Sequence, residues 1–132
     1  MTYLLDTNTC IKFLNGQSDS IRRRFESIAA SELSLCSVVK AELLYGAVKS
    51  ARPEANLEKL ALFFQRFISL PFDDSAAETY GRIRARLERQ GKPIGPNDLL
   101  IASIALINHH VLVTHNLGEF GRIEELVLED WE

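Results

Sequence analysis

Several acidic and amide side chains of this chain come directly after a short apolar run, or lie in the first turns of a helix that follows a strand or a glycine- and proline-rich loop. They are Asp6, Glu42, Asp98, Asn116 and Glu119. Short apolar runs next to helical periodicity are typical of buried strands, so each of these groups is expected near a strand end. Because ligands in open parallel sheets bind outside the carboxyl ends of the strands, we expect these side chains to share one site.

Such a group of carboxylates has a clear chemical use. Acidic side chains in one cleft repel one another unless a cation neutralises them, and hard oxygen ligands favour Mg²⁺ or Mn²⁺. The chain has no cluster of histidine and cysteine at zinc-binding spacing. A bound divalent ion polarises a phosphodiester and lowers the pKa of its water, so we expect phosphodiester hydrolysis.

Each acid also has a purely structural interpretation. Asp6 could cap the helix that follows it, and Asp98 could interact with the dipole of its own helix. Glu42 could be a solvated residue on a helix surface. Residue types alone leave both interpretations open for every position.

The expected elements alternate between strand and helix. In the first half we expect a strand at Tyr3–Leu5, a helix at Thr7–Leu14, a helix capped by Asp19 or Ser20 that ends near Ala30, a strand at Leu33–Cys36, and a helix capped by Ser37 that ends near Ala51. In the second half we expect a helix from Pro53, a brief strand at Leu70–Phe72 and a helix opened by a Ser75–Glu78 capping box and ending near Gln90. A loop rich in glycine and proline then brings Asp98 to the first turn of a helix that continues to Ile107, followed by a strand at Val111–Thr114 and an edge strand within residues 126–132. This order predicts an α/β fold, a central parallel sheet with helices on both faces, in a single domain covering residues 1–132.

Composition excludes some classes of protein. No apolar run is long enough to cross a membrane and no secretion signal is apparent, so we expect a soluble cytoplasmic protein. Cys10 and Cys36 lie in apolar segments and are expected to be reduced and buried. The net charge of -3 argues against bulk attraction to nucleic acid. The basic residues at 22–24 and 82–92 fit either a solvated surface or an RNA contact.

Four motifs together resemble one family. They are Leu5-Asp6-Thr7-Asn8, Ser37-Val38-Val39-Lys40-Ala41-Glu42-Leu43, Pro93-Ile94-Gly95-Pro96-Asn97-Asp98 and Val113-Thr114-His115-Asn116-Leu117-Gly118-Glu119-Phe120. Taken in this order, they resemble the PIN-domain ribonucleases, and within them the VapC toxins of type II toxin-antitoxin systems. The resemblance covers essentially the whole chain and implies a PIN-like fold and a metal-dependent endoribonuclease.

The resemblance also implies roles for individual residues. Asp6, Glu42 and Asp98 would bind Mg²⁺, for which Mn²⁺ would substitute. Where the family often has a fourth acid this chain has Asn116, with Glu119 three residues later, so either side chain is a candidate for that role. Asn8 and Thr114 would orient the metal ligands or water.

The family further implies partners. A VapB-type antitoxin would lie over the active-site groove, and the toxin would form a homodimer, with a larger toxin-antitoxin complex as a further possibility. The RNA substrate implied is tRNA, in particular the anticodon stem-loop of initiator tRNA.

Three competing hypotheses remain at this point. A phosphoacceptor receiver domain is also α/β and binds Mg²⁺, but the strand Leu33–Cys36 ends next to serine rather than aspartate. A metal-independent nuclease would use His109, His110 or His115 as acid and base. A PIN fold without catalysis would only bind RNA or a partner.

Overall fold

Five short parallel strands form the centre of the molecule. The computed structural model describes residues 1–132 and orders the strands β3-β2-β1-β4-β5. Their bounds are β1 Tyr3–Leu5, β2 Leu33–Cys36, β3 Ile68–Leu70, β4 Val111–Val113 and β5 Leu128–Glu129. The chain moves outward in one direction from β1 to β3 and then in the other from β4 to β5, so the order reverses between β1 and β4. Open sheets bind ligands at such a reversal.

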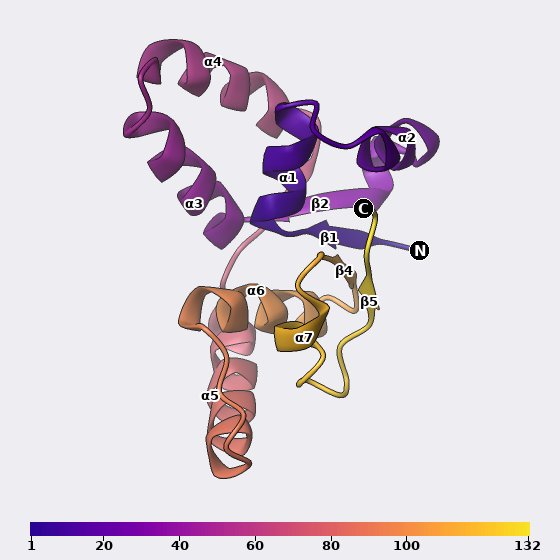
Figure 1. Ribbon diagram of the computed structural model, residues 1–132. Helices are drawn as coiled ribbons and strands as arrows, with labels where there is room; N and C mark the ends of the chain where they lie inside the picture. Colours follow the sequence, from indigo (N-terminus) through magenta and orange to yellow (C-terminus); the bar gives the residue numbers. More distant parts are fainter.

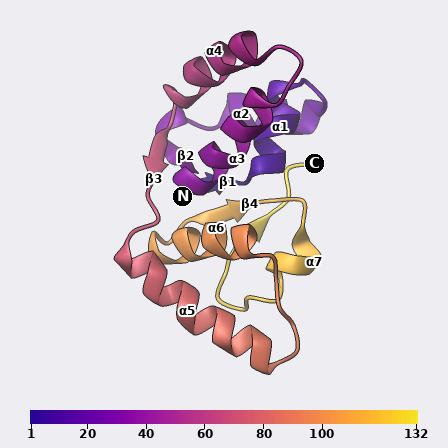
Figure 2. The ribbon, with the colours of Figure 1, turned by 90° about the vertical axis from the view of Figure 1, so that its left-hand side faces the viewer.

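Helices cover both faces of this sheet, as expected from the sequence (Figure 1). Above it in that view lie α1 Thr7–Leu14, α2 Asp19–Ser27, α3 Ser37–Val48 and α4 Pro53–Phe64. Below it lie α5 Asp74–Arg89 and α6 Pro96–Ile107, with the single-turn helix α7 Leu117–Phe120 beside β4. Figure 2 shows the long α5 packed along α6. The predicted α/β class is therefore confirmed.

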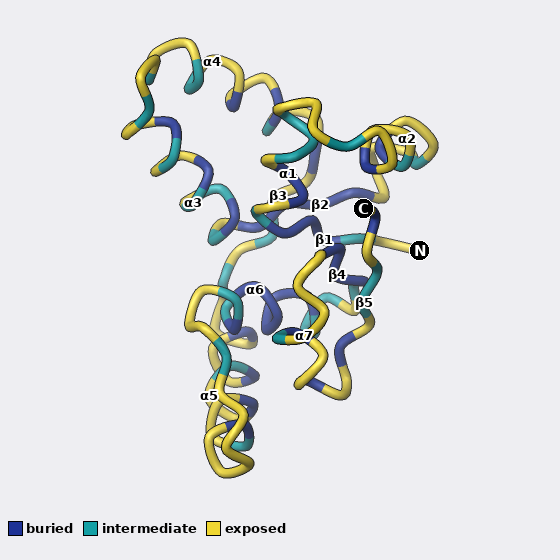
Figure 3. The backbone as a smooth tube through the Cα atoms, viewed as in Figure 1, coloured by how far each residue is buried: buried dark blue, intermediate teal, exposed yellow.

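The core lies between the sheet and these helices (Figure 3). All residues of β2 and β4 are buried, as is usual for strands covered on both faces. Cys10 and Cys36 are buried free thiols, as predicted. No helix has both the length and the apolar character required to cross a membrane.

The C-terminal segment closes the aromatic end of this core. Trp131 is 3% exposed and packs edge-on against Tyr3 and Phe25, with ring centroids 5.3 and 5.9 Å apart. The Ser20 hydroxyl donates to the Trp131 carbonyl at 2.6 Å. Residues from both ends of the chain are thereby held beside β1.

Several predicted helix starts were wrong. The second helix is capped by Ser18, whose hydroxyl accepts from the Ile21 N–H, and not by Asp19 or Ser20. Ser37 is the first residue of α3 rather than its cap. Asp73 caps α5 through the Ala76 N–H, which replaces the predicted Ser75–Glu78 capping box. In each case neighbouring polar residues could serve equally well, and the direction in which the chain leaves the preceding segment selects one.

Three other boundaries also moved. The second helix ends at Ser27 and α3 at Val48, earlier than the predicted Ala30 and Ala51. The strand expected at Leu70–Phe72 is β3, Ile68–Leu70, and it ends immediately before Pro71. Its register pairs Ser34 with Ile68, which matches the buried strand β2 along its length. Proline has no N–H for a ladder and therefore stands outside the strand.

Candidate active site

Asp6 lies directly after β1, where the strand order of the sheet reverses. It is 7% exposed and caps α1 by accepting a hydrogen bond from the Thr9 N–H at 2.8 Å. Burial raises the pKa of the Asp6 carboxyl, and hydrogen bonds from Thr114 and Thr9 oppose that effect. The capping role is therefore confirmed, and the cap bond to Thr9 uses only part of the acceptor capacity of this carboxylate.

Glu42 reaches the same edge from the second turn of α3. The hydroxyl of Thr7, one residue after Asp6, donates to Glu42 Oε1 at 2.6 Å. This contact links the start of α1 to α3 and orients the Glu42 carboxylate. Sequence reasoning missed Thr7, although its place between Asp6 and Asn8 in the first motif was a signal that its hydroxyl faces the site.

Asp98 is in the first turn of α6, on the opposite face of the sheet from α3. Burial raises the pKa of its carboxyl to about 6, and the negative charges of Glu119, Glu42 and Asp6 contribute to the rise. The other three acids therefore lie close enough for their charges to act on Asp98. Asp98 also shares a hydrogen bond with Glu119, so it carries the proton of that pair as the pH falls.

Glu119 is held in place by groups from two segments. Its Oε1 accepts from the Gly95 N–H at 2.5 Å, which lowers the pKa of Glu119, and its Oε2 accepts from Asn116 Nδ2 at 3.2 Å. A Cβ at Gly95 would stand 3.3 Å from Glu119 Oε1, so glycine permits this close approach. Sequence reasoning also missed this contact, because a backbone donor leaves no signal in residue type.

Asn116 acts as the N-cap of α7. Its Oδ1 accepts from the Glu119 N–H at 3.4 Å, and its own N–H donates to the Thr114 hydroxyl at 3.0 Å. Thr114 is fully buried. The amide of Asn116 is thus occupied in positioning Glu119, while Asn8 is exposed and makes no hydrogen bond.

The acids of the site lie at one sheet edge, but no three of them bring their carboxylate oxygens within 4.8 Å of one another. Among His, Cys, Asp and Glu, the only trio with all ligand atoms within 4.8 Å of one another is His115, Asp130 and Glu132, and all three are exposed. There His115 Nδ1 lies 2.9 Å from Asp130, and Glu132 forms an ion pair with Lys12. Because this ammonium group already neutralises Glu132, the trio is explained by attachment of the C-terminal segment.

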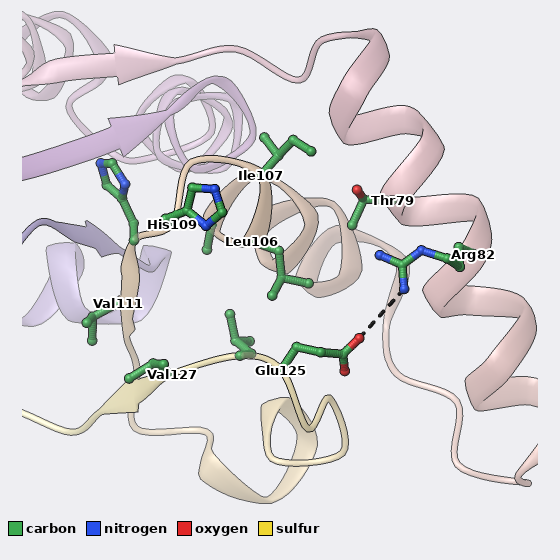
Figure 4. A pocket seen from close by; sticks show the side chains of 11 residues that line it. Thr79, Arg82, Leu106, Ile107, His109, Val111, Glu125 and Val127 are labelled. Atoms are coloured by element: carbon green, nitrogen blue, oxygen red, sulfur yellow. Dashed lines mark ion pairs between the residues drawn. The ribbon is translucent and has the colours of Figure 1, made fainter.

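The three histidines do not gather at one place. His109 and His110 precede β4 and line a cavity of about 410 Å³ at the amino edge of the sheet, opposite the acids (Figure 4). His110 Nδ1 lies 2.8 Å from the Asn108 carbonyl oxygen. His115 is at the carboxyl edge, so the arrangement offers no pair of histidines for acid-base catalysis without a metal.

Comparison with known proteins identifies this arrangement. The family model described as PIN domain matches residues 3–126. The chain belongs to the PIN-domain family. It is 42% identical to ribonuclease VapC2 of Rickettsia felis, covering 100% of this chain and 99% of that protein. It is 43% identical to the tRNA(fMet)-specific endonuclease VapC of Salmonella typhimurium, covering 99% and 98%.

Solved structures agree with the sequence relatives. The crystal structure of DNA-bound VapBC from Salmonella typhimurium matches with a TM-score of 0.94 and 42% identity, covering 100% of this chain and 99% of that one. The structure of VapBC2 from Rickettsia felis bound to a promoter DNA fragment matches with a TM-score of 0.92 and 41% identity, covering 100% of both chains. Within the PIN-domain family, the chain is therefore a ribonuclease of the VapC group. The receiver-domain alternative was wrong.

Proposed function

We propose that this chain is the toxin of a VapBC-type toxin-antitoxin module and acts as an Mg²⁺-dependent endoribonuclease on tRNA. The observation that carries the proposal is the convergence of Asp6, Glu42, Asp98 and Glu119 at one sheet edge. Membership of the VapC group supports the reaction class.

The donor set fits a hard divalent cation. Every group at the edge offers oxygen. Burial, and then the negative charges of Glu119, Glu42 and Asp6, raise the pKa of Asp98, and a bound cation would offset both effects. We propose Asp6, Glu42 and Asp98 as ligands, with Glu119 as the fourth acid and Asn116 as the residue that positions it. Mg²⁺ usually keeps several of its waters, so it suits a site whose carboxylates are not all within 4.8 Å of one another. Mn²⁺ has the same ligand preference and is expected to substitute.

The protein residues around the metal would hold its carboxylate ligands in place and orient water or substrate. Bound Mg²⁺ would supply charge for the developing phosphorane oxygens and a water of lowered pKa. Thr7 keeps one Glu42 oxygen in place, and Thr114 connects Asp6 to the turn that carries Asn116. Asn8 is exposed at the start of α1, so we propose that it orients water or a substrate oxygen.

For the substrate, one relative carries the name tRNA(fMet)-specific endonuclease, at 43% identity across almost the whole chain. We propose the anticodon stem-loop of initiator tRNA, which would arrest translation. Since tRNA is a cytoplasmic molecule, we propose that the protein acts in the cytoplasm.

For the partners, we propose a VapB-type antitoxin and a homodimer. A groove of about 250 Å³ between α1, α3 and α4 has the apolar side chains of Ile11, Leu14, Leu43 and Leu60 in its walls. Glu42 lines the same groove, so an apolar antitoxin segment bound there would cover one acid of the site. Exposed Tyr45, Val48 and Leu62 nearby offer apolar area for a larger assembly.

Cleavage of purified total tRNA by the antitoxin-free protein tests the proposal. The wild type is compared with Asp98→Asn in Mg²⁺, in Mn²⁺ and in chelator. Asp74→Asn is the matched control, since Asp74 is also an acid in the first turn of a helix but is exposed on α5. We expect discrete fragments that require metal, persist in Asp74→Asn and disappear in Asp98→Asn.

Two results would contradict this function. Equal inactivity of wild type and Asp98→Asn, with RNA binding intact, would favour a PIN domain that only binds. Cleavage that persists in chelator would reject a role for the metal.

A further inference from the structure

An open hollow lies beside the acidic site, between the turn at residues 91–93 and α7. Its volume is about 730 Å³ and it is mostly polar. Its lining consists of Gly91, Lys92, Pro93, Leu117, Gly118, Gly121 and Arg122. Gly118 precedes Glu119 in α7, and the Gly95 N–H that binds Glu119 belongs to the loop that continues from Pro93. The hollow is therefore lined by the residue before the proposed fourth acid and by the start of the loop whose Gly95 N–H holds that acid.

The two cations of this hollow form no ion pair, although the charge of Arg122 helps to lower the pKa of Glu119. On the nearby helix α5, Arg82 and Arg86 form ion pairs with Glu125, and Arg84 with Glu88. Lys92 and Arg122 form no ion pair, although Arg122 Nη1 donates to the Pro93 carbonyl at 2.5 Å and so holds the two walls together. Lys92 and Arg122, together with Arg89 at the end of α5, are therefore the basic residues of this region that no ion pair neutralises.

Three glycines leave the floor of the hollow without side chains. A Cβ added at Gly118 would have no heavy atom within 4 Å, so the space above this residue is open. Gly91 has a φ of +68°, which side chains disfavour, and it sets the turn that presents Lys92. Bare backbone between two cations allows close approach by a ribose-phosphate chain, and the exposed Leu117 adds an apolar face for a ribose or base.

We propose that this hollow binds the RNA backbone at a phosphate flanking the scissile one, through Lys92 and Arg122. This inference rests on the proposed ribonuclease function and adds the direction in which the substrate strand leaves the acids. Two cations that face an open channel suit a continuous single strand better than an enclosed small anion.

Binding is the first test, because it does not depend on catalysis. All variants carry Asp98→Asn. The probe is a synthetic stem-loop RNA that contains the cleavage site found in total tRNA, or the anticodon stem-loop of initiator tRNA if no cleavage site is found. Lys92→Gln and Arg122→Gln remove charge, while glutamine at 122 keeps an N–H donor for the Pro93 carbonyl. We expect each to weaken binding about fivefold and to flatten the slope of log affinity against log salt by about 0.7 for each lost phosphate contact.

A steric variant tests the same surface without changing charge. Gly118→Leu would place a side chain in the hollow, whereas Gly81→Leu is the matched control at another helical glycine with open space around its Cβ. Arg23→Gln on α2 is the charge control, since Arg23 is exposed and without an ion pair. We expect Gly118→Leu to weaken binding about tenfold, with both controls and all melting temperatures close to those of the parent protein.

An RNA probe with a neutral methylphosphonate next to the cleaved bond identifies the phosphate. If the hollow holds this phosphate, the neutral probe binds the parent and the Lys92→Gln/Arg122→Gln double variant equally. Hollow variants that bind charged RNA like the parent would overturn the inference, even if the wild type cleaves tRNA and the proposed function holds. A protein that binds no RNA would overturn both. A chain that binds RNA through the hollow but does not cleave would overturn the proposed function alone.

Discussion

Asp98→Asn should stabilise the metal-free protein while strongly reducing its stabilisation by metal. In the folded protein the pKa of Asp98 rises from 3.8 to about 6, first because of burial and then because of Glu119, Glu42 and Asp6. Because the pKa of Asp98 is higher in the folded than in the unfolded protein, its contribution to stability is fully present below pH 3.8 and is lost as the pH rises through about 6. At neutral pH the folded wild type therefore bears the cost of an ionised Asp98.

The size of this cost follows from the pKa difference. At about 1.4 kcal/mol for each pKa unit the upper limit is roughly 3 kcal/mol, and screening by solvent at this partly exposed site reduces it to about 1 to 2 kcal/mol. Asparagine behaves like a permanently protonated Asp98, since its amide can donate to Glu119. We expect the variant to melt about 3 to 8 °C above the wild type in chelator at pH 7.5.

Thermal unfolding from pH 4 to 8, with chelator and with Mg²⁺, provides the assay. The difference between variant and wild type in chelator should vanish near pH 4 and grow toward pH 7. Mg²⁺ at a hundred times its dissociation constant should stabilise the wild type by about 2.7 kcal/mol and the variant much less. The difference in melting temperature between the two proteins should therefore narrow or change sign. A variant that melts at or below the wild-type temperature in chelator at pH 7.5 would refute the inference that burial and the neighbouring acids destabilise ionised Asp98. Asp74→Asn, outside the site, should show no such pH-dependent difference.

Two further predictions concern neighbours of the site. Thr7→Val removes the hydroxyl that donates to Glu42 and should lower kcat or Mg²⁺ affinity about tenfold in a tRNA cleavage assay. Thr7→Ser keeps the hydroxyl and should retain most of the activity. Equal activity of both variants would show that Glu42 does not need this hydrogen bond. His115→Ala should keep more than about half of the wild-type cleavage rate, because His115 contacts Asp130 rather than a second catalytic base. Loss of cleavage with unchanged metal binding in His115→Ala would instead support the hypothesis that a histidine acts as acid or base in catalysis.

Local sequence pattern was sufficient for most of the fold. Short, mainly apolar runs at Tyr3–Leu5, Leu33–Cys36 and Val111–Thr114 predicted β1, β2 and β4, because strands buried on both faces need mainly apolar side chains. Only β4 differs, since it ends one residue earlier, at Val113. Helix caps were predicted less well, since Ser18, Asp19 and Ser20 are all competent caps and tertiary packing decides among them. The shift of β3 has the same origin, because pairing with β2 rather than residue type sets its register.

For the site, the sequence by itself determined which acids stand near strand ends, and hence that Asp6, Glu42 and Asp98 could meet. Only the tertiary structure decided how they are held. Thr7 reaches Glu42 across 35 residues, and the Gly95 N–H reaches Glu119 across 24. Such contacts depend on how α1, α3, α6 and α7 pack around the sheet edge. Long-range packing has no periodicity along the chain, so pattern reasoning names the acids but does not reveal the donors that orient them.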